Sequence, residues 1–160
     1  MRVIIFFFLA LNAHYFSAQQ DVKKLDELIQ NWHKSASDAQ FDSYFKCLTD
    51  DFIFLGTAPG ERWTKKEFQE FSKPFFDRGK AWDFKASNRI WNFSKDGKTA
   101  WFDEDLATWM QGCRGSGVCI KTKGLWSISY YNLTVLIENE KIKEKAVTET
   151  ELYEKIIRQI

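Results

Sequence analysis

A β-hairpin between residues 84 and 110 constrains the fold of this chain more than any other segment. Its arms meet at Lys95-Asp96-Gly97-Lys98, and an Asp-Gly pair between two strand-like arms is a strong signal for a two-residue turn. That turn fixes which residues face each other across the two strands. The predicted pairs are Trp91 with Phe102 and Arg89 with Glu104 on one face, and Asn92 with Trp101, Ile90 with Asp103 and Phe84 with Trp109 on the other.

The second arm of this hairpin, Ala100-Trp-Phe-Asp-Glu-Asp-Leu106, mixes large aromatic side chains with three acids. Successive side chains of a strand point to opposite faces, so Phe102 and Glu104 share one face while Trp101 and Asp103 share the other. Since one face should be buried, we predict that Glu104 points into the protein and that Asp103 points out.

The composition fits one domain without a nucleic-acid footprint. The chain has 160 residues, a formal charge of +1 with acids and bases interspersed, and 17% aromatic residues. That length suffices for a single core, and the charge balance does not favour binding of nucleic acid. Some of the aromatic rings can fill the core, and the others are available to line a cavity or a contact surface.

The first 18 residues resemble a secretory signal. Arg2 precedes an apolar run from Val3 to Leu11, and small residues at Ser17-Ala18 follow, although Phe16 stands where a small residue is usual. The run is shorter than the roughly 20 apolar residues of a membrane-spanning helix. We therefore expect cleavage near Ala18, a periplasmic or secreted chain, and no membrane segment in the mature protein.

Three helices are predicted in the first half of the chain. Apolar residues recur at helical spacing over residues 22–36, with His33 at the edge of the stripe, and again over residues 41–48. His33 is more readily explained as a boundary side chain than as a ligand. A third helix begins with a capping box at Thr64 and Glu67, should kink or end at Pro74, and stops by Gly79.

The rest of the domain is predicted as strands. A short strand at residues 52–55 ends in a turn at 56–60, and a hairpin turns at Lys123-Gly124. The glycine-rich residues 112–117 have neither the spacing nor the following helix of a phosphate loop and indicate a bend or bulge. The register of the last strand stays open, so Tyr130, Tyr131 and Asn132 are not assigned to a face.

Neither disulfides nor a metal site is expected. Cys113 and Cys119 are six residues apart on one predicted strand arm, about 20 Å at strand rise, whereas a disulfide needs Cα atoms within about 7 Å. A bond from Cys47 to either of them stays open, but free thiols are the simpler interpretation. No Cys/His spacing typical of a metal site is present. Beyond the domain, residues 140–160 are predicted to form an amphipathic helix.

Four segments together resemble the SnoaL-like branch of the nuclear-transport-factor-2-like superfamily. The resemblance covers residues 25 to 139, and it implies an α+β fold in which a curved antiparallel sheet wraps the N-terminal helices as a cone with a pocket between them. The predicted organisation is thus a signal at 1–18, a cone domain at 21–139 and a C-terminal helix at 140–160. The segments are Gly-Thr-x-x-Gly-Glu-Arg-Trp (56–63), Ala-Trp-Phe-Asp-Glu (100–104), Arg-Gly-Ser-Gly-Val (114–118) and Trp-x-Ile-x-x-Tyr-Asn-Leu (126–133).

The superfamily includes isomerase-like and cyclase-like enzymes as well as domains without chemistry, so fold alone does not decide function. Isomerase-like members carry a carboxylate base just beyond the first strand, where this chain has Gly56-Thr57. No family catalytic residue can therefore be carried over. We expect an exported domain that binds a small carbonyl-containing or anionic ligand, with no cofactor and no metal.

Arg89 and Glu104 are the candidate site residues that follow from the hairpin itself. Two charges inside the cone must meet each other or further donors, because burying each ion alone costs several kcal/mol. A structural pair is the simpler interpretation. In the functional one, Arg89 or Arg114 holds the ligand against Glu104. The remaining expected ligand-binding residues are Asn132, Trp32, Trp63, Trp91 and Phe102.

Two alternatives stay open. The first is a cofactor-free isomerase, cyclase or hydrolase with Glu104 as general acid or base. The second is a dimerisation or accessory module without a ligand. For the latter, and for a homodimer in general, the outer sheet face offers an apolar patch of Phe84, Ile90, Trp101 and Trp109.

Overall fold

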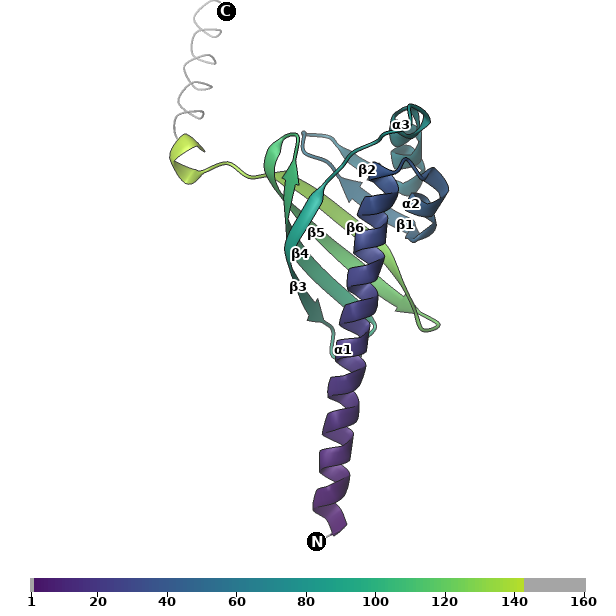
Figure 1. Cartoon of the computed structure of the whole chain (residues 1–160), viewed down its shortest axis with the longest axis vertical. Helices are drawn as coiled ribbons and strands as arrows, with labels where there is room; N and C mark the ends of the chain where they lie inside the picture. The colour runs from purple at the N-terminus through teal and green to yellow at the C-terminus, as the bar shows by residue number, and fades with distance from the viewer. Residues whose placement is uncertain (1, 143–160) are drawn as a thin grey trace, which may run out of the picture.

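A computed structural model of the chain describes the backbone of residues 2–142 and the side chains of residues 19–142. Helices precede and flank one six-stranded sheet, whose strands lie in the order β2-β1-β6-β5-β4-β3 (Figure 1). The helices are α1 (Arg2–Ser37), α2 (Phe41–Lys46) and α3 (Lys65–Asp77). The strands are β1 (Leu48–Leu55), β2 (Arg62–Thr64), β3 (Lys85–Phe93), β4 (Thr99–Thr108), β5 (Gln111–Thr122) and β6 (Leu125–Val135).

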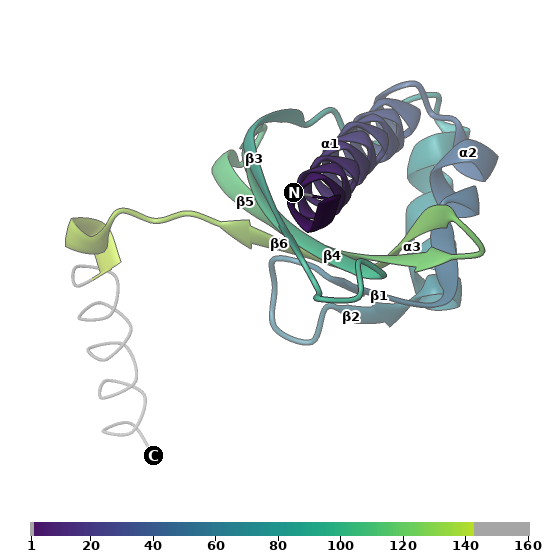
Figure 2. The same cartoon turned by 90° about the horizontal axis from the view of Figure 1, so that it is seen from below.

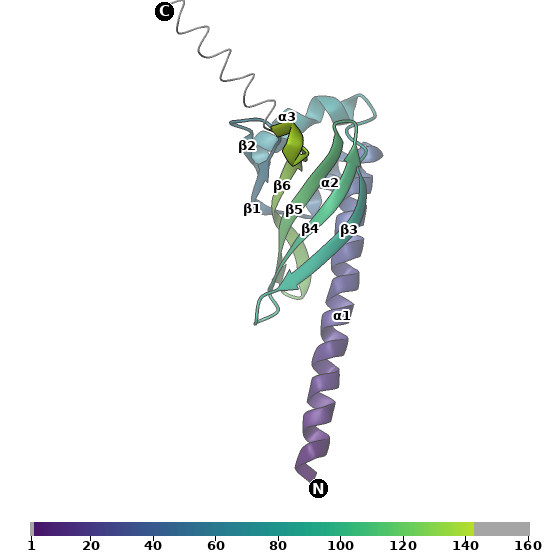
Figure 3. The same ribbon diagram turned by 90° about the vertical axis from the view of Figure 1, so that its left-hand side faces the viewer.

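The sheet curves around α1, which lies along its concave face, while α2 and α3 lie beside α1 at the β1–β2 side (Figure 2). The predicted apolar stripe of α1 faces the sheet: Leu25, Ile29, Trp32 and Ala36 are buried. The helix runs on past the end of the sheet toward the N-terminus (Figure 3). The expected cleavage near Ala18 falls within α1 and stays a prediction. No helix in the described part of the chain is both long and apolar enough to cross a membrane.

The expected α+β cone is confirmed, with one difference in the sheet. Four of the five strand pairings are antiparallel, but β1 pairs with β6 in parallel, so the sheet is mixed. β1 also begins at Leu48, which was predicted to belong to the preceding helix, and it includes Asp50 and Asp51. Both acids are exposed, and they lie where the register of β1 against β6 shifts, between Leu48 and Ile53.

The register predicted from the Asp96-Gly97 turn is confirmed for the half of the hairpin that lies next to the turn. Trp91 pairs with Phe102, Asn92 with Trp101 and Ile90 with Asp103. Between Ile90 and Ser87, farther from the turn, the register shifts by one residue at a bulge. Asn88 in this bulge adopts a left-handed conformation with φ of 51°.

This bulge overturns the expected position of Phe84. On the side of the bulge away from the turn, Ala86 rather than Ser87 lies opposite the buried Leu106. Phe84 is half-buried and packs against the core instead of joining the outer face. Trp109 is also not on the outer face, because it lies in the turn between β4 and β5.

Helix α3 begins at the predicted capping box. The Thr64 side chain accepts a hydrogen bond from the Glu67 backbone, and the Glu67 carboxylate accepts one from the Thr64 backbone N–H at 2.8 Å. The helix does not end at Pro74 but continues to Asp77, and Gly79 with φ of 81° follows it. Phe68 and Phe76 form its buried face, whereas Phe71 is 42% exposed.

The glycine-rich residues 112–117 belong to β5 and are not a bend, which corrects the sequence interpretation. A register shift does occur, but one step later, between Val118 and Cys119. In β6 the pairing places Tyr131 and Leu133 on the buried face. Cys47, Cys113 and Cys119 are all free thiols.

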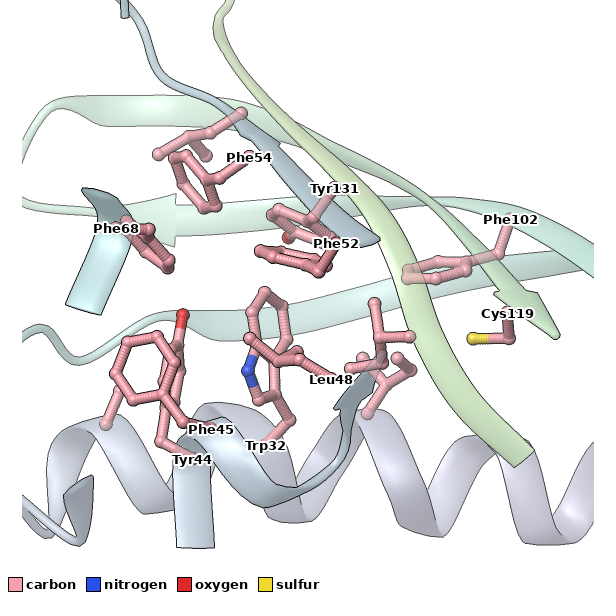
Figure 4. Close-up of a cluster of buried hydrophobic side chains, with 14 of the residues drawn as sticks. Trp32, Tyr44, Phe45, Leu48, Phe52, Phe54, Phe68, Phe102, Cys119 and Tyr131 are labelled. Atoms are coloured by element: carbon pink, nitrogen blue, oxygen red, sulfur yellow. The ribbon is translucent and has the colours of Figure 1, made fainter. Parts of the chain in front are cut away.

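Large aromatic side chains fill the space between α1 and the sheet. Trp32 reaches from α1 to Tyr131 on β6, with ring centres 4.7 Å apart, and stacks on Tyr44 of α2 at 4.9 Å (Figure 4). Toward the other end of the sheet, Phe102 and Cys119 continue this core. The interior of the cone is therefore packed and not hollow at its centre. The predicted C-terminal helix falls almost entirely on residues outside those described.

Candidate functional site

Glu104 is a buried carboxylate that accepts four hydrogen bonds. It lies on the inner face of β4, is 1% exposed and thus confirms the prediction that Glu104 points inward while Asp103 is exposed. Its Oε1 atom accepts from His33 Nε2 at 2.7 Å and from the Tyr131 hydroxyl at 2.9 Å. Its Oε2 atom accepts from Arg89 Nε at 2.9 Å and Nη2 at 2.7 Å. Four donors nearly fill the lone-pair positions of one carboxylate.

The network continues from Arg89 back to α1. Arg89 Nη1 donates to Asp26 Oδ1 at 3.0 Å, and Trp91 Nε1 donates to the same oxygen at 2.9 Å. Arg89 is thus held by two carboxylates, one from the strand beside it and one from the helix. These bonds tie α1 to the β3–β4 hairpin, which is where the sheet curves over the helix.

The environment of Glu104 stabilises its charged form. Burial by itself raises the pKa of a carboxyl group, but hydrogen bonding to His33 and the positive charge of Arg89 outweigh it, and the pKa of Glu104 lies below its ordinary value. The pKa of Tyr131 is raised well above its ordinary value by burial and by the neighbouring Glu104 charge. Tyr131 is therefore a neutral donor to an ionised acceptor.

Two glycines of β5 make room for this network. Gly115 pairs with Glu104 on one side and Leu133 on the other, and a Cβ atom there would overlap the Tyr131 hydroxyl and lie 3.0 Å from Glu104 Oε1. Gly117 lies opposite Phe102 in the same way. The Arg-Gly-Ser-Gly segment is thus a strand whose inner positions must be small.

A polar groove opens beside this network, between α1 and the start of β3. It encloses about 530 Å³, and its lining includes His33 and Arg89. His33 is 7% exposed, and among the described residues its Nδ1 atom has no hydrogen-bond partner. The other lining residues are Gln30, Lys34, Ser37, Asp83, Phe84, Lys85 and Ala86.

An apolar pocket of about 250 Å³ lies on the other side of Phe84, which lines both cavities. Its walls come from β1, the β1–β2 loop, β2, α3, the segment before β3, the β4–β5 turn and β6. It contains none of the Glu104 network. The lining residues are Phe54, Gly56, Thr57, Glu61, Trp63, Phe68, Phe71, Phe75, Ala81, Trp82, Phe84, Trp109, Met110 and Leu133.

The structure separates the residues that were expected to share one ligand site. Only Trp63 lines the apolar pocket, and only Arg89 lines the polar groove. Trp32 and Phe102 are buried in the core, and Trp91 is half-buried on Phe102 with ring centres 4.6 Å apart. These three line neither cavity.

Two expected site residues lie outside the cone. Arg114 is exposed on β5 opposite Asp105, because its neighbours Cys113 and Gly115 take the inner face. Asn132 lies on the outer side of β6 between Tyr131 and Leu133, and it donates to Thr134 Oγ1 at 3.2 Å. Both had been expected among the ligand-binding residues, and the sequence had left the face of Asn132 open.

Three members of the network were not identified from the sequence. Asp26, His33 and Tyr131 meet Arg89 or Glu104 across separations of 27 to 71 residues. Only the inner position of Glu104 pointed to them, because a buried carboxylate requires donors. In the described part of the chain no group of three or more His, Cys, Asp or Glu side chains is arranged to hold a metal ion.

Many solved structures share this fold. No curated protein matches the chain. Among solved structures, an NTF2-like protein with a cystatin-like fold from Novosphingobium aromaticivorans superimposes with a TM-score of 0.64 at 11% identity, over 80% of this chain and 90% of that one. An NTF2-like protein from Cytophaga hutchinsonii matches with a TM-score of 0.59 at 19% identity, over 74% and 98% of the two chains.

A third match is to a candidate scytalone dehydratase from Novosphingobium aromaticivorans, with a TM-score of 0.63 at 9% identity over 77% of this chain and 89% of the other. At these identities the three structures show the shared fold. The family model for the SnoaL-like domain matches residues 25–138, which is more than half of the chain. The chain therefore belongs to the SnoaL-like domain family of the NTF2-like superfamily.

Proposed function

We propose that this chain is a small-molecule-binding domain whose ligand is an apolar ring compound held in the apolar pocket. The observation that carries the proposal is the composition of that pocket, whose walls are aromatic or aliphatic apart from Thr57 and Glu61. Ligand sites are typically concave, mostly apolar and furnished with few polar groups. Its volume of about 250 Å³ also suits a small ring, since a cavity of about 150 Å³ can hold benzene.

The interior carboxylate is better suited to supporting the fold than to holding this ligand. Glu104 already accepts four hydrogen bonds, and a ligand at that carboxylate would have to displace Arg89, His33 or Tyr131 from a buried ion. The charge of Arg89 faces Glu104 and Asp26, which weakens the expectation of an anionic ligand held there. The proposed binding function therefore belongs to the pocket beyond Phe84.

The experiment is a titration with tert-butylbenzene, a neutral ring of suitable size, followed by the indole N–H resonances of the seven tryptophans. Binding in the pocket should shift the resonances of Trp63, Trp82 and Trp109, which line it. The resonances of Trp101 and Trp126 should stay in place as internal controls. An unchanged spectrum at saturation of the probe would overturn the proposal.

A second candidate function is acid–base catalysis in the polar groove, and the specific observation for it is His33. Nε2 donates to the ionised Glu104, so in the neutral form of His33 the proton lies on Nε2 and the Nδ1 atom carries the lone pair. Arg89 uses three of its five N–H groups in the network and lines the same groove. In this alternative His33, oriented by Glu104, removes a proton from the carbon next to a carbonyl while Arg89 faces the carbonyl oxygen.

The direct test of this alternative is proton exchange at the carbon next to the carbonyl of 2-tetralone in D2O, followed by NMR. Catalysis in the groove predicts exchange faster than in buffer, and loss of that acceleration in His33→Gln. The variant Lys34→Gln, in the same groove, should keep it because Lys34 takes no part in the network. An exchange rate equal to that of buffer would exclude this reaction.

A further inference from the structure

One ionisable side chain stands among the residues that line the apolar pocket. It is Glu61, from the loop between β1 and β2, and the other lining residues carry no charge. Among the described residues no Lys, Arg or His lies within 4 Å of its carboxylate. Glu61 therefore brings a negative charge to the pocket wall without a protein counter-charge beside it.

The loop fixes the position of this carboxylate. The backbone N–H of Ala58 donates to Glu61 Oε2 at 2.9 Å, and the backbone N–H of Gly56 donates to the Glu61 carbonyl oxygen at 2.8 Å. A Cβ atom on Gly56 would overlap the carboxylate, so a glycine is required for Glu61 to take this place. The carboxylate is held by the fold before any ligand arrives, which lowers the cost of binding.

The aromatic walls of the pocket favour the same sign of ligand charge. Trp63, Phe71 and Trp82 line the pocket, and Trp63 and Phe71 are stacked on each other with ring centres 4.4 Å apart. The π faces of such rings attract cations, with Trp the strongest of them. In a pocket partly screened from water, the Glu61 charge repels an anion and attracts a cation.

We propose that the pocket selects an organic cation, a protonated or quaternary amine with an apolar body of one ring. This specificity rests on the proposed binding function and names its ligand class. The apolar body occupies the pocket that Trp63, Phe71 and Trp82 line, and the positive charge lies beside Glu61. The proposal assigns no role to Arg89 or Glu104.

The test compares the binding of three probes: the cation phenyltrimethylammonium, the neutral tert-butylbenzene, which has the same shape without the charge, and the anion benzoate. Binding is followed by the indole N–H resonances of Trp63, Trp82 and Trp109. The cation should bind about tenfold more tightly than its neutral analogue, a difference within the range of cation–π and carboxylate contacts. Benzoate should produce no shift of these resonances.

Two variants and one control separate the charge of Glu61 from the shape of the pocket. Glu61→Gln removes the charge, and Gly56→Ala displaces the carboxylate while keeping it. Both should remove the preference for the cation over tert-butylbenzene, measured as the ratio of the two affinities in each variant. Glu70→Gln makes the same charge change on α3 outside the pocket and should preserve the preference.

The outcomes distinguish the two proposals. Equal affinity for the cation and the neutral ring, or a preference that survives Glu61→Gln, would overturn the cation specificity while leaving ring binding in place. If neither probe shifts the three indole resonances, the proposed binding function fails as well.

Discussion

His33 Nε2 lies 2.7 Å from Glu104 Oε1, and this contact joins the first helix to the fourth strand across 71 residues of sequence. It is one of four bonds that hold a single buried carboxylate. Because a buried ion needs all its partners, the network holds α1 against the curved part of the sheet. The apolar pocket proposed to bind the ligand contains none of these network residues.

We predict that Glu104→Gln destabilises the fold without changing ring binding. The change removes the buried partner of Arg89 and leaves the guanidinium with the partly exposed Asp26, so the cost should approach the roughly 3–5 kcal/mol of a broken buried ion pair without exceeding it. The control Asp103→Asn alters the neighbouring, exposed acid and should change stability by less than about 0.5 kcal/mol. Urea unfolding gives both values. An equal, small effect of the two variants would show that the network contributes little.

The depressed pKa of Glu104 predicts a pH dependence of that difference. A carboxyl group with a lower pKa in the folded state stabilises the fold above its unfolded pKa, near 4.5, and this stabilisation is lost as the pH falls through the folded pKa. The gap in unfolding free energy between the wild-type chain and Glu104→Gln should therefore be widest near neutral pH and shrink on acidification. A gap that stays constant from pH 7 to pH 3 would contradict this account of Glu104.

Gly115 provides a test of the packing around the network. In Gly115→Ala the new Cβ atom would overlap the Tyr131 hydroxyl, and we expect a loss of roughly 1–3 kcal/mol in unfolding free energy, as for other overpacked cores. Gly112→Ala is the matched control on the same strand, because no heavy atom lies within 4 Å of its added Cβ. Thermal unfolding compares the two. Equal stability of both variants would mean that Tyr131 moves aside freely.

The sequence predicted those features that depend on local chemistry. The Asp96-Gly97 turn determined the pairing of Trp91 with Phe102, and the alternation of β4 then separated Glu104 from Asp103. The capping box of Thr64 and Glu67 likewise predicted the start of α3 correctly. In each case the signal lies within a few residues of the structure that it specifies.

The features that were missed depend on distant parts of the chain. The bulge at Asn88 moved Phe84 from the outer face to the wall of the pocket, and only the left-handed tolerance of asparagine hinted at it. The inner glycines of β5 are explained by Tyr131 and Glu104, which lie on other strands. No local pattern connects residues on different strands, so the sequence did not show that Arg114 would be exposed on β5.

The outer face of the sheet leads to a prediction on oligomeric state. Ile90 and Trp101 are 60% and 45% exposed there, and we propose that this face forms the expected homodimer without Phe84 and Trp109. Sedimentation at micromolar concentration should show a dimer that Trp101→Glu converts to a monomer. A wild-type monomer would rule out the interface.

The most direct test of the central claim is to block the pocket. Ala81 lines it, and the larger side chain of Ala81→Leu should occupy the space that a ligand needs. The exposed Ala107 of β4 lies outside both cavities and gives the matched control Ala107→Leu. The account predicts that tert-butylbenzene binds the wild-type chain and Ala107→Leu alike, and that Ala81→Leu weakens binding by at least about tenfold, near 1.4 kcal/mol. Equal affinity of all three chains, or binding to none, would contradict it.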